Sequence, residues 1–336
     1  MNSLSPCEPA VAIPNFADIE DAALRLKGQA VRTPLLESPL LNRRVGGRLL
    51  VKAEVLQRTG SFKFRGAYNH ISRLDAAQIN AGIVAYSSGN HAQGVAAAAE
   101  IVGAPATIIM PSDAPALKIA NTKSYGAEVL TYDRYHQDRE AIGAEMAAET
   151  GASLVRPYDD AWVIAGQGTV GLEITEQCAE LGITPDAVLS PAGGGGLIAG
   201  TSLALEARLQ TTKLYACEPE GFDDHRRSLE AGDRTANDDG PKSFCDALLA
   251  SIPGEMTFAI NRDRLAGGFA VSDEEVAAAM AIAFTDLKIV VEPGGAVALA
   301  AALAGRIKTR DRTTVVVTSG GNVDPVLFDQ VLRNAG

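Results

Sequence analysis

The sequence lacks a long apolar run, a cluster of basic residues and any pair of cysteines at metal-ligand spacing. No stretch approaches the roughly 18 apolar residues that a membrane-spanning helix needs, so we expect no membrane segment. The first twenty residues contain three prolines and three acidic residues in place of a basic and then apolar leader. A cytoplasmic location is therefore predicted.

Positive charge is also scarce, because the formal net charge of the 336 residues is -11. Nucleic-acid backbones are bound by clustered Lys and Arg, so a nucleic-acid partner is not expected and a small-molecule substrate is. The four cysteines are far apart in the chain, which predicts buried, reduced thiols and no disulfide framework. They are Cys7, Cys178, Cys217 and Cys245.

Short apolar, β-branched runs alternate with Ala-rich stretches of helical period, which predicts an α/β protein with mostly parallel sheets. The expected strands are Leu49 to Val55, Ile83 to Tyr86, Ala106 to Met110, Val129 to Tyr132, Ala187 to Leu189, Leu214 to Cys217 and Thr313 to Thr318. The expected helices are Val95 to Val102, Asp138 to Glu149, Ile198 to Arg208 and Glu274 to Asp286. The polar stretch from Glu220 to Lys242 is expected to be irregular.

Four successive glycines, Gly193, Gly194, Gly195 and Gly196, lie between an expected strand and an expected helix. Without side chains, their backbone N–H groups can converge on an anion, and a helix N-terminus adds positive potential. A phosphate site is the favoured interpretation, and a tight turn is the alternative.

Lys63 lies between Phe62 and Phe64, directly after a Thr-Gly-Ser turn. Aromatic neighbours remove water from an ammonium group and lower its pKa, as a nucleophilic lysine requires. An ordinary solvated helix lysine remains the alternative, because composition alone does not separate the two.

Ser87, Ser88, Asn90 and His91 follow the expected strand that ends at Tyr86. Their hydroxyl, amide and backbone donors suit a carboxylate ligand. Ser and Asn are also favoured at helix N-caps, so a purely structural capping cluster is an equal alternative.

Glu218, Asp223 and Asp224 are close enough in sequence to share a hard divalent cation, although a solvated acidic loop is the commoner meaning of such residues. His70, His136 and His225 have no partners at metal or triad spacing. We expect these three histidines to be surface or structural residues.

Four segments together resemble the serine/threonine dehydratase and serine racemase group of fold-type II pyridoxal 5'-phosphate (PLP) enzymes. They are Ser61 to Ala67, Ser87 to Gly94, Gly193 to Leu197 and Ser319 to Asn322, and they occur in the order of that group. The resemblance implies two open, mostly parallel twisted sheets covered by helices. It also implies a large PLP-binding domain (1–69 and 160–336) and a smaller, mobile substrate-loop domain (70–159).

The resemblance assigns a role to each segment. Lys63 would carry the cofactor and act in catalysis together with Ser88, and Phe62 would pack beside the cofactor. Asn90, Gly193 to Gly196 and Ser319 would bind the cofactor's 3'-oxygen, phosphate and ring nitrogen. The substrate would contact Ser87, Ser88, Gly89, Asn90, His91 and Arg139. Glu218, the carbonyl group of Phe222 and Asp224 would hold a divalent cation (Mg, Mn or Ca).

The activity that the resemblance implies is an L-threonine/L-serine ammonia-lyase that yields a 2-oxo acid and ammonia. Arg139 keeps a 3-hydroxyaspartate dehydratase open as an alternative, together with a serine racemase that has side elimination. A non-catalytic PLP carrier is the alternative from another class. Ala247 replaces a common glycine and would narrow the substrate pocket, and a homodimer or higher homo-oligomer is expected.

Overall fold

The computed structural model describes residues 12–334 and contains two β-sheets. The larger sheet has the strand order β1-β2-β10-β7-β8-β9. Its β1 strand is antiparallel to β2, and every other pair in this sheet is parallel. The strands are Leu35–Glu37 (β1), Arg48–Ala53 (β2), Ala187–Pro191 (β7), Lys213–Pro219 (β8), Gly267–Val271 (β9) and Thr313–Thr318 (β10).

The smaller sheet is parallel throughout and has the order β5-β4-β3-β6. Its strands are Ile83–Tyr86 (β3), Ala106–Pro111 (β4), Glu128–Tyr132 (β5) and Ser153–Leu154 (β6). All four residues of β3 are buried, as expected of a parallel strand that is covered on both faces.

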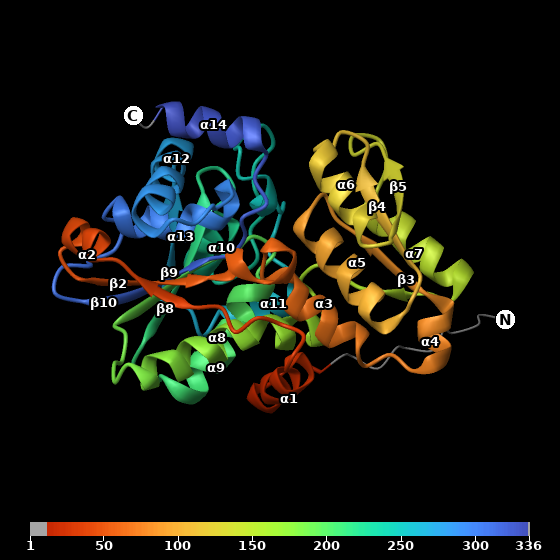
Figure 1. Ribbon diagram of the computed structural model, residues 1–336, viewed down its shortest axis with the longest axis horizontal. Helices are drawn as coiled ribbons and strands as arrows, with labels where there is room; N and C mark the ends of the chain where they lie inside the picture. The colour runs from red at the N-terminus through yellow and green to blue at the C-terminus, as the bar shows by residue number, and fades with distance from the viewer. Residues whose placement is uncertain (1–11, 335–336) are drawn as a thin grey trace.

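Helices cover both sheets. In Figure 1 the larger sheet lies between α12 and α13 on one side and α8 and α9 on the other, while α5, α6 and α7 surround the smaller sheet. The helices are α1 (Phe16–Leu26), α2 (Pro39–Val45), α3 (Lys63–Ile71), α4 (Ala76–Ala81), α5 (Asn90–Val102), α6 (Ala116–Ser124), α7 (Arg139–Thr150), α8 (Ala161–Glu180), α9 (Gly196–Arg208), α10 (Asp224–Ala231), α11 (Glu255–Asn261), α12 (Asp273–Ile282), α13 (Pro293–Leu303) and α14 (Pro325–Asn334). The predicted α/β class with two mostly parallel sheets is confirmed. Among residues 12–334, every helix is too short or too polar to cross a membrane.

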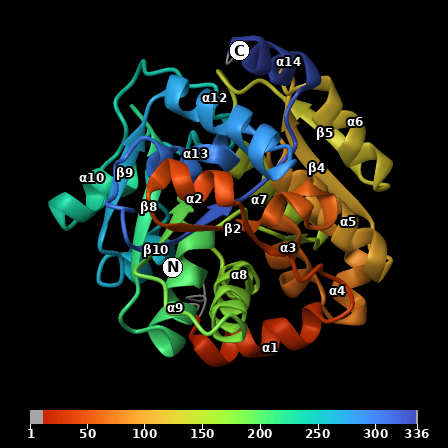
Figure 2. The same ribbon diagram turned by 60° about the vertical axis from the view of Figure 1, so that its left-hand side comes forward.

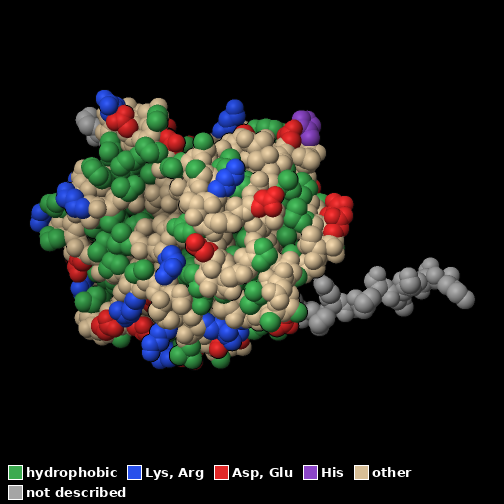
Figure 3. Space-filling model, turned by 45° about the vertical axis from the view of Figure 1, so that its right-hand side comes forward, with side chains coloured by type: hydrophobic (Ala, Val, Ile, Leu, Met, Phe, Trp, Pro, Cys, Tyr) green, Lys and Arg blue, Asp and Glu red, His purple; other side chains and the backbone are tan. Residues whose placement is uncertain are grey.

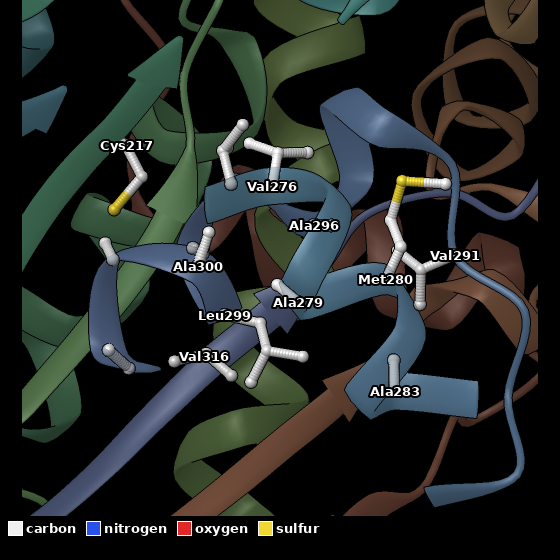
Figure 4. Packing of buried hydrophobic residues seen from close by; sticks show 14 of the residues in the cluster. Cys217, Val276, Ala279, Met280, Ala283, Val291, Ala296, Leu299, Ala300 and Val316 are labelled. Carbon is white, nitrogen blue, oxygen red and sulfur yellow. The ribbon is translucent and has the colours of Figure 1, made fainter. Parts of the chain in front are cut away.

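Small side chains bring the elements close together. Figure 4 shows Val276, Ala279 and Met280 of α12 packed together with Ala296 and Leu299 of α13. Below that sheet, α8 and α9 pack side by side, and α1 runs beside α8 (Figure 2). At Gly200 of α9 a Cβ atom would lie 2.4 Å from the carbonyl oxygen of Ile164, so only glycine allows this approach. The helices therefore pack closely on both faces of the larger sheet.

The predicted strands lie within two residues of the observed ones at each end, but the stretch from Glu220 to Lys242 is not wholly irregular. It contains α10, whose N-terminus is capped by an oxygen of Glu218 at 3.1 Å from the backbone nitrogen of His225. The expected helix that ends at Asp286 stops at Ile282 and continues as a π-helical turn. Cys178, Cys217 and Cys245 are free and buried, as predicted, and Cys7 lies outside the described residues.

Candidate active site

A cavity of about 370 Å³ opens where strands of both sheets end. It is lined by Lys63, by the turn after β3, by the glycine loop after β7 and by Ser319 after β10. Carboxyl ends of parallel strands are the usual ligand-binding edge of such sheets. The predicted residues that line it are Phe62, Lys63, Ser87, Ser88, Gly89, Asn90, His91, Arg139, Gly194, Gly195, Gly196 and Ser319.

Lys63 is the first residue of α3, and its side chain is half-buried at the cavity wall. The backbone N–H of Phe62 donates a hydrogen bond to the carbonyl oxygen of Ser319 at 3.1 Å, which fixes the lysine segment beside the end of β10. Lys63 Nζ donates to the carbonyl oxygen of Pro157 at 2.6 Å and lies 5.1 Å from the centroid of the Phe62 ring. Burial and then the charge of Arg139 lower the pKa of Lys63 to about 7. A neutral, nucleophilic amine is therefore accessible near neutral pH.

The glycine loop joins β7 to α9 and leaves backbone in place of side chains at the cavity wall. Gly195 is the N-cap of α9 at φ +96°, and it gives the helix no side-chain cap. A Cβ atom on Gly194 would lie 2.3 Å from the ring of Tyr158, and one on Gly196 would lie 2.5 Å from Gln167 Oε1. Tyr158 thus leaves room only for glycine at position 194, a side chain at position 196 would displace Gln167, and the helix N-terminus faces the cavity with N–H groups suited to a phosphate. Gly193, at φ +54°, turns the chain but does not line the cavity.

The turn after β3 also presents a helix N-terminus without a side-chain cap. Gly89 is the N-cap of α5, and Ser87 Oγ accepts from its N–H at 3.1 Å. Ser88 Oγ forms no hydrogen bond to any part of the chain between residues 12 and 334. The capping alternative therefore does not account for these residues, whose free groups suit a carboxylate.

Asn90 and His91 are fixed by long-range hydrogen bonds. Asn90 Nδ2 donates to Glu292, and Asn90 Oδ1 accepts from Asn322 Nδ2 at 2.8 Å. Because an amide group has two N–H donors, one remains for a ligand. The ring of His91 bonds the carbonyl oxygen of Val155 at 2.9 Å. Burial and the charge of Lys63 lower the pKa of His91 to about 3, so this ring is neutral at physiological pH.

Two arginines supply positive charge on the side of the smaller sheet. Arg134 pairs with Asp113 at 2.7 Å. Arg139 begins α7, and its guanidinium carbon lies 5.6 Å from the centroid of the Tyr86 ring. Within residues 12–334, Arg139 has no acidic partner, so its charge is available to an anionic ligand.

Several lining residues escaped the sequence prediction because they reach the cavity only through tertiary structure. Tyr158 packs against the glycine loop, and Lys118 Nζ bonds Asp246 Oδ2 at 2.5 Å across the cavity mouth. Glu292 is buried behind Asn90, and burial raises its pKa to about 7. The one feature of the sequence that could have indicated Glu292 is its place directly after the apolar run Ile289 to Val291. Ala247 lies in the lining, where its extra methyl group was expected to narrow the pocket.

The two acidic residues of the expected cation site meet outside this cavity, between the end of β8 and the start of α10. His225 joins them, with its Nδ1 3.4 Å from Glu218 Oε1 and 4.0 Å from Asp224 Oδ2. All three side chains are buried, so His225 is not a surface residue. Burial and the nearby charge of Glu218 raise the pKa of Asp224 to about 7. Phe222 lies in the intervening turn and donates its N–H to the carbonyl oxygen of Pro219 at 3.1 Å.

Comparisons with known proteins agree with this geometry. The family model described as pyridoxal-phosphate dependent enzyme matches residues 26–320. An L-threo-3-hydroxyaspartate ammonia-lyase of Saccharomyces cerevisiae is 41% identical over 93% of this chain and 94% of its own. One of the same name from Pseudomonas sp. is 43% identical over 95% of this chain and 98% of its own. A serine racemase of Schizosaccharomyces pombe is 40% identical over 94% of this chain and 96% of its own.

Solved structures place the chain in the same group. The crystal structure of a threonine deaminase from T.th. superposes with a TM-score of 0.87 at 45% identity, over 93% of this chain and 99% of the other. The glycine loop, the lysine at the cavity wall and the uncapped helix N-termini fit a phosphate-bearing cofactor that is tethered by an amine. The chain therefore belongs to the pyridoxal-phosphate dependent enzymes, in the group of the serine/threonine dehydratases and serine racemases.

Proposed function

We propose that this PLP-dependent lyase eliminates water from 3-hydroxyaspartate and that one water then hydrolyses the resulting imine, so that the net products are ammonia and a four-carbon 2-oxo diacid. Two of the relatives compared above are L-threo-3-hydroxyaspartate ammonia-lyases. They support the acidic substrate better than L-threonine or L-serine, which the sequence had favoured. The proposed substrate carries one more carboxylate than serine, at the β-carbon.

The observation that carries the proposal is the unpaired charge of Arg139 at the cavity wall. Arg139 is half-buried, and hydrogen bonds to charged groups contribute about 1.5–3 kcal/mol. A substrate with a β-carboxylate satisfies Arg139, whereas serine presents a hydrogen atom and threonine a methyl group at that position. Sites built around a polar partner discriminate strongly against analogues that lack it.

The chain's own groups account for the remaining chemistry. When bound, PLP supplies an electron sink that makes the α-hydrogen of an amino acid acidic. Lys63, whose pKa is lowered to about 7, takes up that proton as a neutral amine. The N-terminus of α5 and Ser87 to His91 hold the α-carboxylate, and Ser88 Oγ is a second group able to hold a proton. Gly194 to Gly196, Asn90 and Ser319 orient the cofactor.

A panel of four amino acids tests the proposal: L-threo-3-hydroxyaspartate, L-serine, L-threonine and L-aspartate. We expect ammonia and 2-oxo acid from hydroxyaspartate with kcat/KM roughly 10–100-fold above that for serine. Arg139→Gln should remove most of this preference while leaving the rate with serine within about twofold. Arg208→Gln, at the far end of α9, is the matched control and should keep the preference.

Other results would identify other functions. A preference for threonine or serine that Arg139→Gln leaves unchanged would return the assignment to a threonine/serine ammonia-lyase, as in the solved threonine deaminase. Formation of D-serine faster than ammonia release would indicate a racemase. Bound PLP with no turnover of any substrate in the panel would favour a non-catalytic carrier.

We further propose that a divalent cation, Mg²⁺, Mn²⁺ or Ca²⁺, binds Glu218, Asp224 and the carbonyl group of Phe222. The support is the pair of buried carboxylates, each anchored through one oxygen. Glu218 Oε2 accepts from the N–H of His225, and Asp224 Oδ1 accepts from Asn237 Nδ2 at 2.9 Å. Oxygen ligands of this kind suit hard cations.

A further inference from the structure

Three buried ligand atoms that have no hydrogen-bond partner within residues 12–334 lie near one another at the end of β8. They are Glu218 Oε1, Asp224 Oδ2 and His225 Nδ1, and their side chains are at most 1% exposed. They come within 4.8 Å of one another. Buried polar atoms are almost always satisfied, so three orphans in one place indicate a missing common partner.

The spacing does not suit direct pairing of the histidine with the acids. A charge-assisted N–H···O⁻ bond is about 2.7–2.9 Å long, whereas His225 Nδ1 is 3.4 Å from Glu218 Oε1 and 4.0 Å from Asp224 Oδ2. Around an ion with bonds of about 2.1 Å, ligands at right angles lie about 3 Å apart and opposite ligands about 4.2 Å apart. The two observed separations lie between these limits.

Asn261 can fix the tautomer of His225 that metal binding through Nδ1 requires, in which the proton is on Nε2. His225 Nε2 lies 3.2 Å from Asn261 Nδ2, and Asn261 Oδ1 has no partner in residues 12–334. A half-turn of the Asn261 amide places its oxygen on Nε2. The ring then donates Nε2–H to this oxygen and directs the Nδ1 lone pair toward the two carboxylates, the arrangement typical of metal-bound histidine.

We propose that His225 Nδ1 is a ligand of the cation and that this nitrogen shifts the site's preference from Mg²⁺ and Ca²⁺ to transition-metal ions such as Mn²⁺, Co²⁺ and Zn²⁺. The inference rests on the proposed cation site and adds the identity of its third side-chain ligand. Imidazole suits these ions, whereas all-oxygen sites suit Mg²⁺ and Ca²⁺. The ligand set expected from the sequence did not include His225, and the spacing of the histidines did not indicate that any of them binds a metal.

The same ring connects the cation to the cofactor loop. A Cβ atom on Gly195 would lie 2.7 Å from His225 Nε2, so the imidazole packs directly against the N-cap of α9. An ion bound to Nδ1 fixes the ring on which this N-cap rests. Loss of the ion should therefore loosen the phosphate loop and increase the dissociation constant for PLP.

Metal binding to chelator-treated holoenzyme provides the test, with calorimetric affinities and melting temperatures for Mg²⁺, Ca²⁺, Mn²⁺, Co²⁺ and Zn²⁺. We expect the three transition metals to bind at least tenfold more tightly than Mg²⁺ and Ca²⁺. His225→Asn places an amide oxygen near the Nδ1 position and should reduce that ratio to about threefold or less. His136→Asn, at an exposed histidine, controls for adventitious surface binding and should change nothing.

Pulsed EPR of the Cu²⁺-loaded wild-type protein gives a direct readout that does not depend on any variant folding. We expect modulation from the remote nitrogen of a coordinated imidazole, absent in His225→Asn and retained in His136→Asn. Wild-type protein without this modulation, or His225→Asn with the wild-type order of affinities, would overturn the inference. Glu218→Gln separates the two proposals. If Glu218→Gln loses all metal binding while His225→Asn binds metals like the wild-type protein, the cation site stands and His225 is not a ligand. If no cation binds or stabilises the wild-type protein, both proposals fail.

Discussion

The lowered pKa of Lys63 has one local cause, burial, and one cause that is distant in the sequence, the charge of Arg139. The burial of Lys63 beside Phe62 could be anticipated from the sequence, but the influence of Arg139 could not, because that residue is far along the chain and belongs to α7. Together they lower the pKa of the amine from 10.5 to about 7. The protonated amine cannot attack a carbonyl group, so the pH at which the lysine becomes reactive reports this shift.

We predict that the rate constant for association of PLP with cofactor-free protein rises with pH through a midpoint near 7. The sign follows from the lowered pKa, since the neutral amine predominates above the midpoint. Arg139→Gln removes one of the two lowering influences and should move the midpoint upward, while Arg134→Gln should leave it in place. Stopped-flow absorbance of the protein-linked cofactor measures the rates. A midpoint near 10, or one that is equal in all three proteins, would contradict the assignment.

The sequence motifs located most of the cavity lining because each motif is local. Lys63, the turn from Ser87 to His91 and Ser319 follow strand ends, and parallel strands bring those ends together. Tyr158 could not be found in this way, because it comes from an irregular segment whose path depends on the whole fold. The segment of Asp246 and Ala247 was expected at the pocket only from the family resemblance. His225 was missed for the same reason as Tyr158: its carboxylate neighbour Glu218 belongs to a strand, and only the turn between them makes them meet.

At the scale of elements, apolar periodicity predicted seven of the ten strands in the described residues, missed β1, β6 and β9, and did not predict the polar helix α10. The eight residues of α10 contain four charged side chains of Asp, Arg and Glu and only one leucine, so they show no apolar stripe. The helix is stabilised by an oxygen of Glu218, which accepts from two backbone N–H groups in its first turn. A cap that comes from the preceding strand cannot be predicted from the sequence of the helix and its first turn.

A buried charge network ties β2, α3 and α8 together behind Lys63. Arg65 pairs with Glu54 at 2.8 Å and with Glu173 at 2.7 Å, and Lys52 pairs with Glu173 at 2.6 Å. Lys52 is held in this network and does not line the cavity, so it is not placed to carry the cofactor. Because Arg65 is the third residue of α3, the network also fixes the position of this helix, which begins at Lys63.

Arg65→Leu should lower the free energy of unfolding by about 3–5 kcal/mol, because it leaves Glu54 buried without its main cationic partner. Arg333→Leu breaks an exposed pair with Asp329 in α14 and should cost less than about 1 kcal/mol. Urea unfolding of the cofactor-free proteins, followed by circular dichroism, measures both. Equal losses in the two variants would show that the buried network does not stabilise the fold.

At the scale of the whole molecule, the cavity lies between the two sheets, and this position suggests how it closes. On the face drawn in Figure 3 acidic and basic side chains are interspersed, so a broad charged surface does not direct the ligand there. Inside the cavity, Arg139 supplies positive charge at the wall. The motif order predicted two sheets, but it could not predict which side chains bridge them. We propose that residues 70–159 move as a unit against the rest of the chain.

The bridge to test is Lys118 of α6, which bonds Asp246 and lies 4.0 Å from Glu292, both on the side of the larger sheet. Succinate, an unreactive dicarboxylate, should occupy the cavity of the holoenzyme and draw the two sides together. Amide exchange in residues 111–118 and 246–250 should then slow by roughly tenfold, equivalent to about 1.4 kcal/mol. Lys118→Met removes the cation from the bridge and should abolish most of that protection, while Lys308→Met, outside the cavity lining, should retain it. Hydrogen exchange with mass spectrometry measures both segments in each protein. If succinate binds but leaves exchange in both segments unchanged, the cavity is rigid and the proposed motion of residues 70–159 is wrong.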